Sequence, residues 1–213
     1  MLEAAASALV QLCTPYYFML FLFGIFMGIG VGLIPGGGGN LQLLRNLYGP
    51  FATDRDFDPL PFLKKMFLTI GTAKVATSAE EAREIGFLGR ADGISLNRDF
   101  LLSDAKARVL GMAESGFRPP RPTHFRLPGR SGAATVDMML YDMQVNNQIS
   151  EYDRHIGQKL AHVITGGDVS AFTPVSEQYL LDLEREAFLS LCGEEKTQDR
   201  IASMLETGKP LRN

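Results

Sequence analysis

Apolar side chains recur at helical spacing along most of the chain after residue 58. The clearest stripe lies in residues 59–70, where four apolar positions share one face of the predicted helix and two lysines occupy the other. Those positions are Leu60, Leu63, Phe67 and Ile70. The same spacing predicts helices over 99–115, 135–145, 150–164, 176–191 and 197–206. The pattern therefore predicts a mostly helical structure with little strand.

Polar residues and prolines mark where several of these helices begin and end. Ser78 followed by Glu81 predicts a capping box, and Gly86 predicts the end of the same helix. Four prolines make residues 117–129 an extended connection, which we expect to be the main internal boundary. Within 99–115, five apolar residues are expected to face the core: Leu101, Leu102, Ala105, Val109 and Met112.

Upstream of these helices, a short apolar run meets a run of glycines. Residues 31–34 predict a buried strand, Pro35 and residues 36–39 predict a sharp turn, and a helix follows from Leu41. Glycines allow a ligand to approach the main chain closely, and the first N–H groups of a helix have no partner within that helix. Such a turn suits an anion or a developing oxyanion, and a purely structural turn is the alternative.

Two common phosphate-binding motifs are excluded at this turn. A Walker loop requires Lys and then Ser or Thr after its last glycine, where this chain has Gly38 and Gly39. A dinucleotide fingerprint that begins at Gly28 would have Leu33 in the place of its third glycine. If the turn binds a ligand, it does so in another way.

The first 44 residues are strongly apolar. No charged residue occurs from Ala4 to Leu44, and residues 16–34 are long enough to span a membrane. However, no basic residue precedes this run and glycines crowd its second half. Two interpretations stay open: a buried strand behind an atypical leader, or a membrane or interfacial helix.

Charge and metal-ligand spacing narrow the function classes. The net charge of −3 does not favour nucleic acid as a partner, because such binding calls for a clustered basic face. Cys13 and Cys192 fit no zinc spacing, and we expect them to be free thiols in a cytoplasmic protein. His155 and His162 are seven residues apart, which is too far to share an ion, so no metal is expected.

The glycine turn and two later segments resemble the crotonase family, which includes the enoyl-CoA hydratases and isomerases. Residues 31–40 resemble the strand, Pro-Gly-x-Gly-Gly turn and helix that line the acyl-CoA pocket of that family. Residues 77–88 resemble its short Ser-Ala-x-x-Ala helix. Residues 175–213 resemble the end of one subgroup, the bacterial multifunctional β-oxidation proteins, which join a 3-hydroxyacyl-CoA dehydrogenase to an enoyl-CoA hydratase domain.

The resemblance implies an incomplete crotonase-like (ClpP/crotonase) α/β fold that is mostly helical in this chain. Residues 1–28 would be an apolar leader without a family match, 29–117 the second half of the core and 118–213 a C-terminal helical region. The implied role is in fatty acid β-oxidation, on acyl-CoA thioesters in which coenzyme A is part of the substrate. The implied partners are this substrate and the missing N-terminal half or the dehydrogenase domain, which would bind NAD. No cofactor is expected in this chain itself.

The same resemblance exposes a gap in the catalytic residues. One catalytic glutamate of the family lies seven residues before the turn proline, and this chain has Gly28 there. Nothing in 1–27 resembles the other glutamate. By resemblance, Gly36 donates its N–H to the catalytic water, and Gly36, Gly37 and Gly38 bind substrate. We therefore expect the chain alone to be a very poor hydratase. The alternative is a non-catalytic helical module attached to a membrane or a partner through 16–34.

Overall fold

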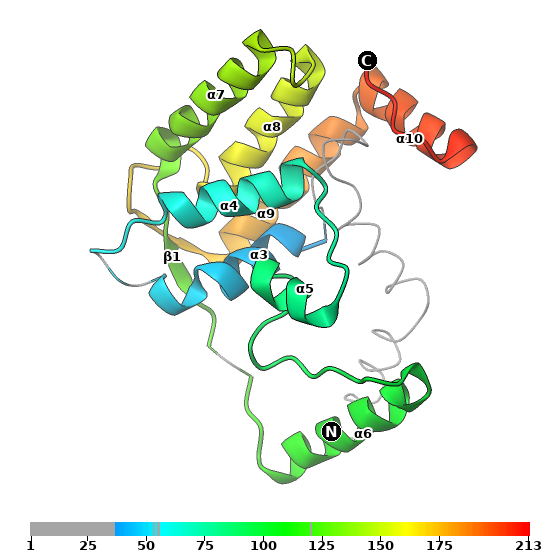
Figure 1. The fold of residues 1–213 in the computed structure, drawn as a ribbon. Helices are drawn as coiled ribbons and strands as arrows, with labels where there is room; N and C mark the ends of the chain where they lie inside the picture. The colour runs from blue at the N-terminus through cyan, green and yellow to red at the C-terminus, as the bar shows by residue number, and fades with distance from the viewer. Residues whose placement is uncertain (1–36, 53, 55, 120) are drawn as a thin grey trace.

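The computed structural model describes residues 37–213 except 53, 55 and 120. The described part is mostly helical, as the apolar spacing predicts (Figure 1). Its elements in chain order are α3 (Gly39–Leu47), η2 (Gly49–Phe51), α4 (Leu60–Gly71), α5 (Ala79–Ile85), η3 (Arg98–Phe100), α6 (Leu101–Glu114), β1 (His124–Arg126), α7 (Gly129–Val145), α8 (Glu151–Ile164), β2 (Pro174–Ser176), α9 (Glu177–Cys192) and α10 (Glu195–Thr207).

Helix α8 lies at the centre of the core and packs against α3, α4, α7 and α9. Ile156 and Leu160 on α8 have no exposed surface, and Ile164 has almost none. Helices α7 and α8 approach closely at Gly157, where a Cβ atom would lie only 2.7 Å from Leu140 Cδ2. The absence of a side chain at Gly157 therefore allows α7 to lie beside α8 as Figure 1 shows.

Two short strands form a small antiparallel sheet beside the helices. Phe125 pairs with Val175, so the middle of the predicted extended connection carries a strand. Phe125 and the following Leu127 are fully buried, and the Tyr48 hydroxyl donates a hydrogen bond to the Arg126 carbonyl at 2.9 Å. The last part of the connection, from Phe125 onward, is therefore part of the core, whereas its described residues before Thr123 are exposed. Helix α7 begins at Gly129, six residues before the predicted start.

The start of α5 confirms one half of the predicted capping box. The Ser78 hydroxyl accepts a hydrogen bond from the Glu81 N–H at 3.0 Å, and Gly86 ends the helix in the left-handed region with φ 93°. The Glu81 carboxylate, however, accepts from the N–H and hydroxyl of Thr77 and not from the Ser78 N–H. The reciprocal contact is thus shifted by one residue from the predicted one.

Helix α6 forms where the pattern predicts, but its predicted inward face is wrong. Not one of its residues is buried, and the side chains of Leu101 and Leu102 are 57% and 73% exposed. Figure 1 shows the reason: α6 stands apart from the helical body at the end of long connecting segments. Its apolar stripe therefore finds no described helix to pack against.

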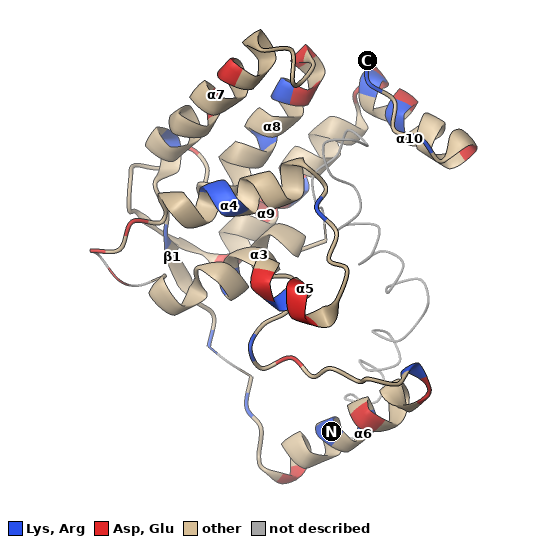
Figure 2. Ribbon diagram, in the orientation of Figure 1, with Lys and Arg blue, Asp and Glu red and all other residues tan. Residues whose placement is uncertain are grey.

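The predicted leader over 1–28, the strand over 31–34 and the apolar run over 16–34 all lie outside the described residues. Within the described part, helices are too short or too polar to cross a membrane. Over the described helices, Lys and Arg are interspersed with Asp and Glu (Figure 2). The same part of the chain holds no group of three His, Cys, Asp or Glu residues placed to bind a metal ion.

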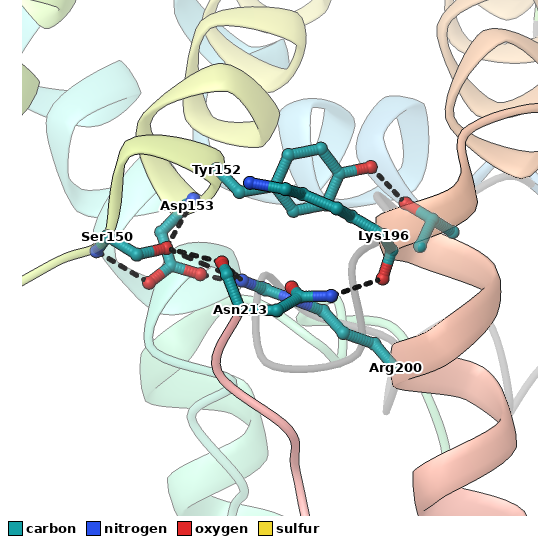
Figure 3. Close-up of polar contacts among 7 residues, drawn as sticks. Ser150, Tyr152, Asp153, Lys196, Arg200 and Asn213 are labelled. Carbon is teal, nitrogen blue, oxygen red and sulfur yellow. Dashed lines mark hydrogen bonds and ion pairs between the residues drawn. The ribbon is translucent and has the colours of Figure 1, made fainter.

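A buried arginine joins α10, α8 and residue 213 (Figure 3). Arg200 has no exposed surface, and its guanidinium donates to the Asp153 carboxylate at 2.6 Å and to Asn213 Oδ1 at 2.8 Å. Its Cζ atom lies 5.0 Å from the centre of the Tyr152 ring. Burial raises the pKa of Asp153, but hydrogen bonds from Ser150 and Arg200 outweigh it and hold that pKa below its ordinary value.

Loss of this buried charge pair should be costly. We expect Arg200→Met, which keeps much of the apolar stem, to lower the free energy of unfolding by roughly 3–5 kcal/mol, because it leaves the Asp153 charge buried without its cation. Arg185→Met is the control, since Arg185 and Asp182 form an exposed pair whose loss should cost about 1 kcal/mol or less. Urea unfolding measures both, and equal losses would contradict the expectation.

Candidate functional site

The candidate site is the glycine turn at the start of α3, which the buried face of α3 holds in place. Leu41, Leu43 and Leu44 are all buried, so the first turn of the helix is anchored in the core. Gly38 precedes the helix with φ 87°, a left-handed conformation that glycine adopts without the strain of a Cβ atom. The apolar spacing of α3 thus fixes where its first N–H groups lie.

Glu184 reaches this turn from α9, 146 residues further along the chain. One of its carboxyl oxygens accepts a hydrogen bond from the Gly38 N–H at 2.6 Å, and its side chain is only 1% exposed. It lies on the buried face of α9, between the apolar residues Leu180, Ala187 and Leu191, and the same face begins with the buried Glu177. The face of α9 that packs onto the core therefore also places a carboxyl group at the glycine turn.

A second polar contact between α3 and α9 shows the relative direction of the two helices. Arg45, seven residues after Gly38, donates from Nε and a terminal nitrogen to Glu177, seven residues before Glu184, at 2.9 and 2.5 Å. The two contacts are seven residues apart on each helix but in opposite sequence order, so the helices are antiparallel here. Seven residues of helix separate the contacts by roughly 10 Å along the axis. The hydrogen bond from Arg45 holds the pKa of Glu177 below its ordinary value.

Burial dominates the electrostatics of Glu184. It raises the pKa from 4.5 to about 7, against the opposing effect of the nearby N–H groups of Gly38, Leu41 and Asn40 and of the Asn40 side chain. The second carboxyl oxygen is buried and has no hydrogen-bond partner among the described residues. A carboxyl group in this state faces the positive end of the α3 dipole, which favours its ionised form, while its apolar neighbours favour the neutral form.

The predicted site residues have different surroundings. Gly36 and Gly28 lie outside the described residues. Gly37 is exposed, and a Cβ atom placed there would meet nothing within 4 Å. The N–H of Gly38 already has the Glu184 carboxyl group as its partner. Of the described pair, Gly37 is the residue with open space for a ligand, and the substrate-binding role of both stays a prediction.

Sequence reasoning missed Glu184 as a member of the site. The signal was present, because positions 180, 184, 187 and 191 form one helical stripe in which a glutamate replaces an apolar residue. A charged residue in a core stripe is rarely buried without a partner. What the sequence does not give is the partner, since no local rule connects residue 184 to residue 38.

Comparison with known proteins found a similar curated protein for this chain. It is named "Probable 3-hydroxyacyl-CoA dehydrogenase" and comes from Bacillus subtilis (strain 168); the two are 48% identical over 191 residues, which is 88% of this chain. The chain spans about a quarter of the length of that relative, 24%. No protein-family model and no solved structure matches the chain.

Glu184 should make stability depend on pH. Because its pKa rises from 4.5 to about 7 on folding, the folded protein holds this proton more tightly than the unfolded chain does. The resulting stabilisation, on the order of 3 kcal/mol, is fully present below about pH 4.5 and is lost as pH rises through 7. Urea unfolding at pH 5 and pH 8 measures it.

Two substitutions on the same helix isolate this effect. Glu184→Gln removes the titrating group, so stability should fall less between pH 5 and pH 8 than in the wild type. Glu186→Gln makes the same chemical change at an exposed position two residues away and should keep the wild-type pH dependence. An identical pH dependence in the wild type and Glu184→Gln would refute the expectation.

The left-handed conformation of Gly38 gives a separate prediction. Gly38→Ala should lower the free energy of unfolding by roughly 1–2 kcal/mol through backbone strain. Crowding is not the cause, because the nearest atom to the new Cβ, Leu181 Cδ2, would be 3.5 Å away. Gly37→Ala, which meets open space, should cost clearly less. Thermal and urea unfolding of the two variants compare them, and equal losses would show that the turn tolerates a side chain at Gly38.

Proposed function

We propose that this chain is the C-terminal part of an enoyl-CoA hydratase domain, in a protein that also oxidises 3-hydroxyacyl-CoA. The observation that carries the proposal is the 48% identity to a probable 3-hydroxyacyl-CoA dehydrogenase over 88% of this chain. That segment is only 24% of the relative, so the activity belongs to a larger protein of which this chain would supply one part. The substrate class would be acyl-CoA thioesters of fatty acid β-oxidation.

The glycine turn suits the chemistry of hydration. Adding water across an enoyl thioester places negative charge on the thioester oxygen, and fixed N–H donors stabilise such charge without reorganising. The turn at the start of α3 combines such donors with the positive end of a helix dipole. The Gly38 N–H already donates a hydrogen bond to Glu184. We therefore assign the ligand-facing donors to Gly36, for the catalytic water, and to Gly37, for the substrate.

The proton-transfer groups would have to come from elsewhere in the larger protein. Gly28 has no side chain that transfers a proton. NAD would bind in the dehydrogenase part and supply the hydride acceptor there. The contribution of residues 29–213 is then to shape the turn and to support it through α8 and α9.

A chimeric protein tests this assignment. Residues 29–213 would replace the matching quarter of the Bacillus subtilis relative, and hydration of crotonyl-CoA would be followed by loss of enoyl absorbance. The residue directly before the inserted segment, which corresponds to Gly28 of this chain, would be Glu in the chimera, since the proposal requires a carboxylate there. The 213-residue chain alone should stay at background, because it lacks the proton-transfer groups, whereas the chimera should turn over substrate.

Gly36→Pro in the chimera should abolish hydration and spare oxidation. Proline removes the Gly36 N–H and fixes φ near −65°, so hydration should fall by about 100-fold or more. NADH formation from 3-hydroxybutyryl-CoA reports the dehydrogenase part and should change little. If the Gly36→Pro chimera hydrates normally, or if no chimera hydrates at all, the chain is better described as a non-catalytic helical module.

A further inference from the structure

We propose that Glu184 is the positioning residue of the glycine turn: it binds the Gly38 N–H from inside the fold and so orients the exposed backbone at Gly37 toward the ligand. This inference rests on the proposed function for its catalytic consequence but on the described contacts for its geometry. Glu184 itself does not face the substrate, because its side chain is 1% exposed.

The first argument is that Glu184 is held rigidly. Leu180 and Leu191 on the same face of α9 are buried in the core, one turn before and two turns after it. Arg45 and Glu177 fix the antiparallel register of α3 and α9 through two parallel hydrogen bonds. The carboxyl group therefore has little freedom to move along α3, and the 2.6 Å hydrogen bond transmits that rigidity to Gly38.

The second argument is that Glu184 is a poor choice for stability alone. Its stripe neighbours are apolar, and burying a carboxyl group with one oxygen lacking a hydrogen-bond partner costs free energy that an apolar residue of similar size would not. A residue that suits packing badly but fills a specific hydrogen bond is typical of sites where local geometry is maintained at some cost in stability.

The third argument is the contrast between Gly38 and its neighbour. Gly38 has a left-handed conformation, its N–H points into the protein, and the next residue begins α3. One residue earlier, Gly37 is exposed and open. Gly38 therefore connects the buried start of α3 to the exposed backbone at Gly37, and its conformation sets the direction of that backbone. A shift of about 1 Å at such a position is enough to cost on the order of 100-fold in rate at an adjacent reacting centre.

The geometric half is tested on the full 213-residue chain by NMR. Amide exchange of Gly38 would be compared with that of Leu160, a core residue of α8, so that global destabilisation cancels. Glu184→Leu keeps the volume and removes the acceptor, and we expect the Gly38 N–H to exchange at least 10-fold faster relative to Leu160, with shifted resonances at Gly37 and Gly38. Glu184→Gln retains an acceptor oxygen and should give intermediate values, while Glu186→Gln should match the wild type.

The catalytic half is tested in the chimera with the same three substitutions. Glu184→Leu should lower kcat for hydration about 10- to 100-fold and change KM less than about 3-fold, because the turn is displaced while most substrate contacts persist. Glu184→Gln should recover a large part of kcat. If Glu184→Leu does not fold, Glu184→Gln still decides, since unchanged Gly38 exchange in a variant with unchanged kcat across pH 6–9 would leave no role for the carboxylate.

The outcomes separate the two proposals. Altered exchange at Gly38 in the 213-residue chain, together with a chimera that never hydrates crotonyl-CoA, would uphold the positioning role and overturn the proposed function. Wild-type kcat in a folded Glu184→Leu chimera would overturn the positioning role and leave the proposed function standing. A fall in kcat that Glu186→Gln reproduces would also overturn it, because that carboxylate does not touch the turn.

Discussion

A carboxyl group removed from water must find hydrogen-bond donors inside the protein, and Glu184 finds one in the backbone at Gly38. This requirement sets the relation between α3 and α9, because the acid must lie at the start of α3 and nowhere else along it. The Arg45–Glu177 pair sets the same relation a further two turns along. Apolar packing brings the two helices together, and these two polar contacts select one register from the many that packing alone would allow.

Where α10 meets α8, a buried positive charge likewise finds hydrogen-bond partners inside the protein. Arg200 is buried between Asp153 on α8 and Asn213 at the last residue of the chain, and the Tyr152 ring covers it. Helix α8 therefore takes part in the core through Ile156 and Leu160 and in this network through Asp153. Among the described residues, helix α6 has no comparable buried contact with the helical body, and it is the element that stands apart in Figure 1.

Local patterns predicted the helices well and their surroundings poorly. The spacing of Leu60, Leu63 and Phe67 located α4, and Ser78 located the start of α5, because both signals lie within a few residues of what they specify. The same spacing in α6 predicted a buried face wrongly, since periodicity shows that a helix is amphipathic and not that a neighbour covers it. The glycine turn was recognised, but its partner Glu184 was not, because that contact joins residues 146 positions apart.

That separation has a consequence for the order of folding. A contact between residues 38 and 184 closes a loop of most of the chain. Such non-local contacts form late, because the chain loses loop-closure entropy before it gains the free energy of the contact. During synthesis, the start of α3 leaves the ribosome long before α9 does, so the turn spends that interval without its internal acceptor. The glycine turn would thus reach its final shape only when the chain is present as far as Glu184. Any truncation before residue 184 would remove its acceptor while leaving the sequence of the turn intact.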